Sequence, residues 1–334
     1  MNWNWLRVVA VVTVPAGVAV FAGAVLGRWA GAVFAVAAVA SVVALALFMA
    51  DRVPLSAMRA RPVGEVEYPQ LYRVVRELSK AARLPVPRIY VSPALQPNSF
   101  AIGHSRRAVK VCCTEGLLRL LTEDELRGVL GHELAHVREH DTVATSFCAG
   151  LAAVITSLAS PAWLVPAGLA NLTASPHRGP ALGVGRLGFL GRPDTAAGAA
   201  RPKEADDEES GRPRRVATGA EPEGTGIAAA LAMLVVGPAA GLLLQLSVSR
   251  RREYRADALG ATLAGDPLAL AQALRKIEAR TVELPLSLTG PLASASPLMI
   301  VNPFSCEGFT RLFTTHPPTG ERVFRLEGLA GYPR

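Results

Sequence analysis

The chain has 334 residues, of which 50% are hydrophobic and 19% are charged. Soluble proteins usually carry about 25% charged residues, so this composition argues against an ordinary soluble protein and favours one that contacts the lipid bilayer. A net charge of +8 could indicate nucleic-acid binding. No helix-turn-helix, zinc-finger or aromatic RNA-binding pattern accompanies it, so we expect no nucleic-acid partner.

Four stretches without a charged residue reach the roughly 20 residues that a helix needs to cross a bilayer. They are residues 8–26, 29–50, 142–170 and 226–249. The first could be a secretory signal peptide, but the second follows it without a convincing cleavage site. We therefore predict two transmembrane helices within residues 1–50 and two more in the later stretches.

Basic residues near the ends of these stretches predict the orientation in the membrane. The arginines that follow the second and fourth stretches are Arg52, Arg59, Arg61, Arg250, Arg251, Arg252 and Arg255. The turn between the first two stretches holds only Arg28. Because cytoplasmic flanks carry the excess of Lys and Arg, we expect residues 51–141 and 250–334 to lie in the cytosol. The sequence thus predicts a multi-pass protein of the cell membrane.

Residues 51–141 are predicted to form the first part of a cytosolic domain. Apolar residues recur at helical spacing over residues 67–83, and Pro85 follows them. Residues 87–92 and 108–113 have the composition of short β-strands, joined by a polar connection. A small β-sheet is therefore expected before the next helix.

That next helix contains the sequence LRGVLGHELAHVREHD, residues 126–141. Thr122 and Glu125 match the S/T-x-x-E capping box, which predicts a helix that begins there and continues through His140. Three histidines should therefore be carried by one helix.

Two of these histidines, His132 and His136, enclose Glu133 in the pattern H-E-x-x-H. Residues four apart differ by about 40° around a helix, so both imidazoles can reach one metal ion. Glu133 is turned by about 100° and can face a bound water. The pattern predicts a catalytic metal site. The alternative, a polar helix face with hydrogen-bonded histidines, is less consistent with this spacing.

Residues 171–225 separate the third apolar stretch from the fourth. They are rich in Gly, Pro, Ala and charge, and they have no periodic apolar face. We predict a disordered polar loop, and strict alternation of four spans places it outside the cytosol.

Residues 250–334 are predicted to form the second part of the cytosolic domain. The helix after the fourth stretch is followed by Asp266, which caps a further helix to about Arg280. A last helix should follow Pro318, whereas residues 281–315 give no clear assignment.

A catalytic zinc needs three protein ligands and one open position. His140 would be the nearest third ligand, but successive i+4 steps advance about 6 Å along a helix, too far for one tetrahedral ion. We predict Glu253 instead, with Asp257, on the same helical face, accepting a hydrogen bond from a ligand histidine. Taken alone, this Glu and Asp would more often be a surface pair.

Four segments together resemble the HtpX-type membrane zinc metallopeptidases, which are relatives of the CAAX prenyl protease type 1 family. The segments are PNSFAIG (residues 97–103), GHELAHVREHD (131–141), SRRREYRADALGA (249–261) and THPPTGERVFRL (315–326). The resemblance covers most of the chain outside the loop. The sequence departs from the family in its long loop between the last two spans and in Ser99, where the family more often has alanine.

The resemblance implies a mainly α-helical, multi-span membrane protein with a cytosolic, gluzincin-like α+β domain carrying a small β-sheet. One zinc ion per chain would be bound by His132, His136 and Glu253, and Glu133 would be the base. His316 would donate to the oxyanion, although a structural histidine before a proline turn is equally plausible.

The resemblance also bears on the substrate, implying cleavage of misfolded or damaged membrane proteins. An extended peptide could pair with a strand at residues 98–101 or 108–112. Asn98 could hold the substrate or its own segment. Two other functions remain open, a scaffold or holdase with a structural zinc and a prenyl-peptide protease.

Overall fold

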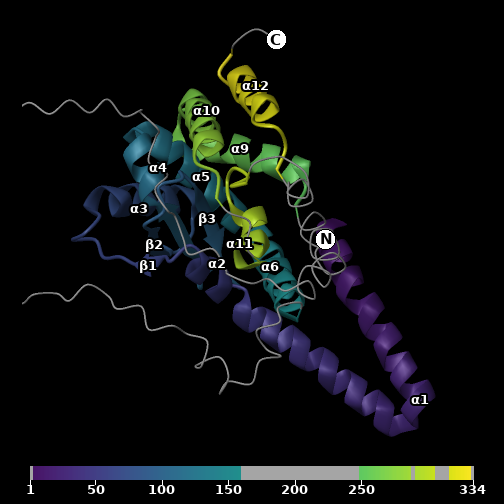
Figure 1. Cartoon of the computed structure of the whole chain (residues 1–334). Coiled ribbons are helices and arrows are strands. Elements are labelled where there is room, and N and C mark those ends of the chain that lie inside the picture. Colours follow the sequence, from purple (N-terminus) through teal and green to yellow (C-terminus); the bar gives the residue numbers. More distant parts are fainter. Residues whose placement is uncertain (1–2, 159–247, 287–289, 305–315, 332–334) are drawn as a thin grey trace, which may run out of the picture. The chain divides into compact units, whose positions relative to one another are not determined.

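The computed structural model covers the whole chain, and residues 3–158, 248–286, 290–304 and 316–331 are described (Figure 1). The described residues belong to one compact unit. The predicted loop at residues 171–225 and nearly all of the fourth apolar stretch lie outside the described residues.

The N-terminal helix α1 (Trp3–Met49) covers both predicted N-terminal spans. It is interrupted at Arg28, whose φ of 53° and ψ of −142° are not helical, and Figure 1 shows it doubling back. The two arms meet at Gly23 and Gly31, where a Cβ on either would clash with the other's carbonyl. Among the described residues, one helix, Thr13–Met49, is long and apolar enough to cross a membrane. The multi-span topology therefore stays a prediction.

Four strands form one sheet in the order β1-β2-β4-β3. They are β1 (Arg61–Pro62), β2 (Arg88–Ser92), β3 (Ser99–Ile102) and β4 (Lys110–Thr114). Strands β2 and β4 are parallel and were predicted from sequence, whereas β1 was not. Strand β3 pairs antiparallel with β4, with Ser99 opposite Cys113.

Two expectations about this sheet can be compared with the structure. The segment containing β3 was interpreted both as part of a polar connection and as a possible strand at residues 98–101; the strand is present, and all four residues of β3 are buried and pair with β4. Residues 108–112 were one candidate for pairing with a substrate, but β4 already has a neighbour on each side. Of these two strands, only β3 lies at an edge of the sheet.

The helices predicted within residues 51–141 and 250–334 are present. They are α3 (Pro69–Ala82), α5 (Glu123–Arg138), α9 (Arg250–Ala264), α10 (Pro267–Glu283) and α12 (Thr319–Leu329). The capping box of Thr122 and Glu125 opens α5, and the Asp266 side chain accepts from two backbone amides of α10. Helix α5 ends before His140, whose φ of 63° is left-handed.

Five short or connecting helices complete the described elements. They are α2 (Arg52–Ala57), α4 (Glu115–Leu120), α6 (Asp141–Leu158), α11 (Gly290–Ala295) and the 3₁₀ helix η2 (Ser296–Leu298). Helix α6 contains the described part of the third apolar stretch and packs against α1. The last two helices occupy the region that the sequence left unassigned.

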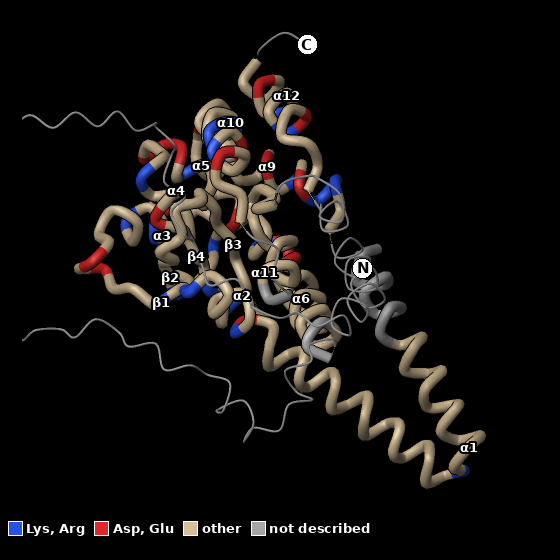
Figure 2. The backbone as a smooth tube through the Cα atoms, viewed as in Figure 1, with Lys and Arg blue, Asp and Glu red and all other residues tan. Residues whose placement is uncertain are grey.

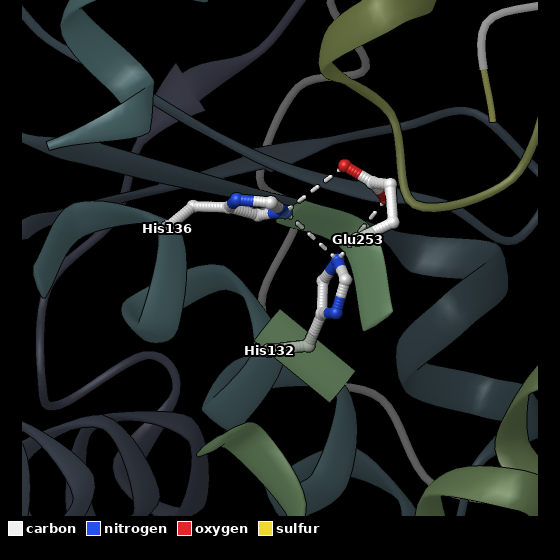
Figure 3. A group of neighbouring side chains, drawn as sticks. All are labelled: His132, His136 and Glu253. Atoms are coloured by element: carbon white, nitrogen blue, oxygen red, sulfur yellow. Dashed lines mark hydrogen bonds and ion pairs between the residues drawn. The ribbon is translucent and has the colours of Figure 1, made fainter. Parts of the chain in front are cut away.

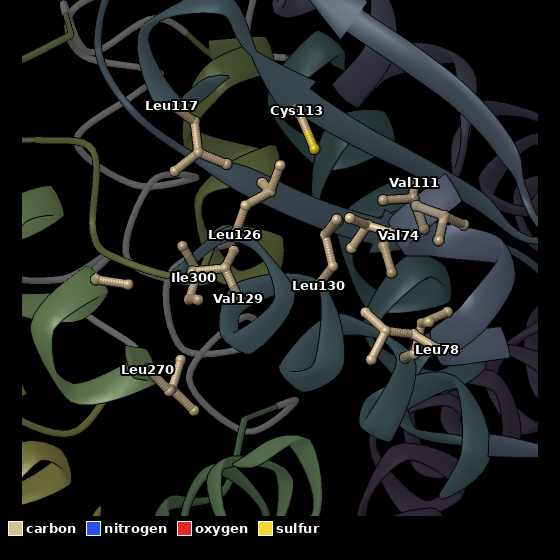
Figure 4. Packing of buried hydrophobic residues seen from close by; sticks show 14 of the residues in the cluster. Val74, Leu78, Val111, Cys113, Leu117, Leu126, Val129, Leu130, Leu270 and Ile300 are labelled. Carbon is tan, nitrogen blue, oxygen red and sulfur yellow. The ribbon is translucent and has the colours of Figure 1, made fainter. Parts of the chain in front are cut away.

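Helix α5 lies in the main hydrophobic core, between the sheet with α3 on one side and α9 with α10 on the other (Figure 4). Its apolar side chains interdigitate with residues from all of these elements. The residues labelled in Figure 4 are Val74, Leu78, Val111, Cys113, Leu117, Leu126, Val129, Leu130, Leu270 and Ile300. Burial on this scale holds α5 in place and therefore fixes the histidines that it carries.

Charge is distributed unevenly over the described elements. Figure 2 shows Lys, Arg, Asp and Glu over the helices that surround the sheet, whereas the part of α1 from Thr13 onward is uncharged apart from Arg28 at its turn. Between Thr13 and Met49 no other residue is charged. This contrast is typical of an anchor that contacts lipid beside a domain that contacts water.

Candidate metal centre

Helices α5 and α9 bring His132, His136 and Glu253 together (Figure 3). One ligand atom from each lies within 4.8 Å of the others. The two Nε2 atoms are 3.2 Å apart, and they lie 3.9 Å and 3.5 Å from carboxylate oxygens of Glu253. Ligands about 2.0–2.1 Å from a tetrahedral zinc are roughly 3.3 Å from one another. The geometry of the three donors therefore fits a zinc ion.

Two glycines let the backbones of α5 and α9 approach closely enough for this arrangement. A Cβ on Gly260 of α9 would lie 2.5 Å from the backbone nitrogen of His132. A Cβ on Gly131 of α5 would lie 2.6 Å from the carbonyl oxygen of Gly260. Neither position accepts a larger side chain without moving a helix. Because Glu253 is on α9, this close contact of the two helices brings its carboxylate near the histidines of α5.

Each histidine of the group uses its other ring nitrogen to contact a carboxylate. His132 Nδ1 lies 2.8 Å from Asp257 Oδ1, the contact that the sequence suggested for Asp257. His136 Nδ1 lies 3.3 Å from Asp141 Oδ2, which the sequence analysis did not anticipate. Such carboxylates fix the proton on Nδ1 and aim Nε2 at a metal. Asp141 follows His136 by five residues, within the same quoted segment.

An arginine supports each of these carboxylates. Arg322 of α12 is 1% exposed and donates to both oxygens of Asp257, at 2.9 Å and 2.7 Å. Arg252 of α9 donates to Asp141 Oδ1 at 2.9 Å. Sequence reasoning missed both arginines because a lone arginine in a helix carries no local signal of burial. Their positions in the two family-like segments were the only hint.

The surroundings set the charges that a metal would meet. Burial lowers the pKa of His132 to about 4, so its imidazole is neutral at pH 7. Burial raises the pKa of the Glu253 carboxyl, but His316 and His136 outweigh it and hold that pKa well below its usual range. Burial lowers the pKa of His136, as it does that of His132. Glu253 and Asp141 outweigh this effect, so the pKa of His136 is raised overall. Surroundings that favour a proton on His136 also favour a cation beside it.

Glu133 faces the pocket beside the three donor groups and is 2% exposed. Its Oε1 accepts a hydrogen bond from Ser99 Oγ at 2.9 Å. Burial raises the pKa of Glu133 to about 7, although His136 and Ser99 counteract part of the increase. A carboxylate with a pKa near neutrality is suited to accept and return a proton.

His316 and Asn98 are placed differently. His316 lines the pocket, and its Nδ1 lies 2.8 Å from Glu253 Oε2. Its Nε2 is buried and has no hydrogen-bond partner among the described residues. Asn98 is fully buried away from the pocket lining, where its amide donates to Val301 and accepts from Ser99. This geometry favours the interpretation that Asn98 holds its own segment.

The free edge of β3 is partly covered by the segment after η2. Ile300 N donates to Ser99 O at 3.0 Å, and Pro297, Leu298, Met299 and Ile300 line the pocket. Ala101 also lines the pocket, two residues further along β3. A peptide that pairs with this edge would therefore meet it at Ala101.

His140 is exposed beyond the end of α5 and does not join the three donors.

Comparisons with known proteins agree with this chemistry. The sequence profile of Peptidase family M48 matches residues 65–330. A protein named Protease HtpX homolog from Kineococcus radiotolerans is 46% identical over 280 residues, 84% of this chain and 80% of the relative. The Protease HtpX homolog of Paenarthrobacter aurescens is 41% identical over 85% of this chain and 80% of its own length. That of Pelotomaculum thermopropionicum is 36% identical over 98% of this chain and 99% of its own.

Proposed function

Because the chain belongs to peptidase family M48 and is therefore a metallopeptidase, we propose that it is a membrane-anchored zinc endopeptidase. It cleaves peptide bonds in misfolded or damaged membrane proteins at the cytosolic surface of the cell membrane. The observation that carries the proposal is the convergence of His132, His136 and Glu253 beside the buried Glu133. Three donors and an adjacent carboxylate are the arrangement expected of a catalytic site, which keeps a fourth position open.

His132, His136 and Glu253 hold the metal, and the carboxylates on the two Nδ1 atoms keep both rings oriented. A zinc ion there supplies a Lewis acid that makes a water easier to deprotonate and a peptide carbonyl easier to attack. Glu133 takes the proton from the attacking water and later delivers it to the leaving amine. No covalent bond to the protein is formed.

His316 is the group proposed to stabilise the oxyanion of the tetrahedral intermediate. Its Nδ1 lies against the Glu253 carboxylate, so its Nε2 can donate to the oxyanion when both ring nitrogens carry a proton. A donor aimed at developing negative charge in a buried site stabilises the transition state more than the ground state.

The anchoring of the site in the membrane is supported by the surface of α1. Large apolar side chains are exposed along both arms, including Val14, Val18, Phe21, Leu26, Trp29, Val33, Phe34 and Phe48. Exposed apolar surface of this extent is stable in lipid and costly in water. The basic residues that follow α1 favour a cytosolic position for the metal centre. The class of substrate rests on the resemblance of the sequence to the HtpX-type peptidases.

The proposal is tested by comparing the purified full-length chain with Glu133→Gln. We expect about one zinc ion per chain in both proteins, because Glu133 is not among the donors. Cleavage of an unfolded protein should fall by about 10²–10⁴-fold in the variant, the usual contribution of a general base. Equal cleavage by the two proteins would contradict the assigned role of Glu133.

Further variants separate the alternatives. Glu253→Ala should lose zinc, whereas Glu283→Ala, which alters an exposed glutamate at the end of α10, should retain it. A wild-type chain that holds zinc and cleaves no substrate would favour the scaffold or holdase. Strict dependence of cleavage on a prenyl group would favour the prenyl-peptide protease.

A further inference from the structure

We propose that in this chain Ser99, at a position where the resembling family more often has alanine, is a positioning residue that holds the Glu133 carboxylate in the orientation needed for proton transfer. The inference rests on the proposed role of Glu133 as the base and adds a residue that acts through it. Ser99 lies on β3, and its Oγ donates to Glu133 Oε1 at 2.9 Å.

Burial makes this hydrogen bond important. Ser99 is 0% exposed and Glu133 is 2% exposed, so the hydroxyl of Ser99 competes with little solvent for the carboxylate. A buried carboxylate oxygen without a donor is energetically costly, and a side chain in that state turns toward whatever partner it can reach. The hydroxyl of Ser99 occupies Oε1 and so limits rotation of the carboxylate.

The hydroxyl itself is held rigidly by the backbone of β3. Ser99 N donates to Asn98 Oδ1 at 3.1 Å, and Ser99 O accepts from Ile300 N at 3.0 Å. Strand β3 is also paired with β4 at this residue. Glu133 belongs to α5, so the hydrogen bond joins two fixed elements, and the carboxylate is held between them. Positioning by a rigid element is effective in active sites because small displacements of a base slow proton transfer.

The chain offers a matched control for the loss of a buried hydroxyl. Ser79 on α3 is also 0% exposed, and its Oγ has no hydrogen-bond partner among the described residues. Ser79→Ala therefore removes the same atom from the same kind of environment without changing a contact to the site.

The test compares cleavage by wild type, Ser99→Ala, Ser99→Thr and Ser79→Ala. We expect Ser99→Ala to lower kcat about tenfold while KM and zinc content change less than about twofold, because misplacement of the base affects the chemical step. Ser99→Thr retains the hydroxyl and should restore most of kcat, and Ser79→Ala should match wild type. A kcat for Ser99→Ala within twofold of wild type, or no rescue by threonine, overturns the proposal.

A second measurement does not depend on activity. Unfolding temperatures of zinc-free Ser99→Ala, Glu133→Ala and the double variant form a thermodynamic cycle for the contact. We expect the double variant to shift by less than the sum of the single shifts, whereas additive shifts overturn the proposal. The cycle tests the contact separately from activity: if the wild-type chain cleaves no substrate, the proposed function fails and the catalytic role of Ser99 fails with it, whereas a non-additive cycle would still show the contact. An inactive Glu133→Gln beside a fully active Ser99→Ala preserves that function and rejects the role of Ser99.

Discussion

The two histidines of the metal centre are each connected to an arginine through an aspartate. His132 leads to Asp257 and Arg322, and His136 leads to Asp141 and Arg252. Burying an ionised aspartate is costly, and the guanidinium of each arginine offsets that cost by supplying charge-assisted hydrogen bonds. The result is that both Nε2 atoms are held toward Glu253 before any ion arrives.

Arg322 provides a direct test of this arrangement. Its guanidinium forms two hydrogen bonds with Asp257 and one with the carbonyl of Ile300, and a lysine cannot reproduce that planar fork. We expect Arg322→Lys to weaken zinc binding about 10–100-fold, as other changes behind a ligand histidine do. The free energy of unfolding should fall by about 1–3 kcal/mol for the unsatisfied buried groups. Chelator competition and thermal unfolding in detergent measure the two effects.

Arg325 supplies the control for that substitution. It lies on the same helix, but its side chain is 53% exposed and pairs with Glu321 at the surface. Arg325→Lys should change the free energy of unfolding by less than about 0.5 kcal/mol and leave zinc affinity unaltered. Equal effects of the two substitutions would show that Arg322 has no special connection to His132.

At the scale of elements, the parts of the fold that sequence predicts are those specified by local interactions. The capping box of α5 and the aspartate cap of α10 involve residues at most three positions apart, and both caps are present. The pairing of β3 with β4 and the burial of both its faces were not predicted, because they depend on distant residues. The residues of the site likewise divide into those specified by local spacing and those specified by the tertiary fold. The spacing of His132 and His136 is local, whereas Ser99 and Arg322 reach it only through the tertiary fold.

The crossing of α5 and α9 is a feature that sequence could not specify, and it can be tested at Gly260. A methyl group there would collide with the backbone of His132, so we expect Gly260→Ala to separate the helices and move Glu253 away from the histidines. Zinc affinity should fall at least about tenfold, consistent with the geometric demands of a tetrahedral site. Gly320→Ala is the control, because a Cβ on Gly320 of α12 would meet no atom within 4 Å. Unchanged zinc affinity in Gly260→Ala would contradict the role given to this crossing.

A substitution of Asn98 can decide whether this residue stabilises the fold at the β3 edge or binds the substrate. Its side chain joins β3 to the segment after η2 through hydrogen bonds with Ser99 and Val301. If it serves the fold, Asn98→Ala should reduce the free energy of unfolding by about 1–3 kcal/mol for buried groups left unpaired. KM of the remaining folded protein should change little. A large increase in KM with unchanged stability would instead assign Asn98 to substrate binding. Gln70→Ala, at an exposed hydrogen bond of α3, serves as the control for stability.

At the scale of the whole molecule, the metal centre is connected directly to the apolar helices. Asp141, which contacts His136, is also the first residue of α6. Helix α6 packs closely on the second arm of α1, where a Cβ on Gly150 would clash with the carbonyl of Ala46. A displacement of the hairpin would therefore be transmitted to the carboxylate that orients His136. The metal centre and its proposed anchor are therefore joined through Asp141 and α6.

The distribution of arginine predicts the orientation of the metal centre and its proposed anchor in the membrane. One arginine lies at the turn of α1, whereas three follow within 12 residues of its end. Because cytoplasmic flanks are enriched in basic residues, we expect the turn at Arg28 to face outward and the metal centre to face the cytosol. Cysteine substitutions can report both positions. Arg28 is exposed at the turn, and Val66, between β1 and α3, is 99% exposed.

A membrane-impermeant maleimide should label Arg28→Cys in intact cells and Val66→Cys only in inverted membrane vesicles. Three native cysteines, Cys112, Cys113 and Cys148, are buried and should not react in the folded protein. The fourth, Cys306, lies outside the described residues and is replaced by serine in both variants. Labelling of Val66→Cys from outside intact cells would reverse the orientation, and the site would then act on the opposite side of the membrane. Labelling of both variants from the same side would show that α1 does not cross the bilayer as a hairpin, because its turn and its end would then share one compartment.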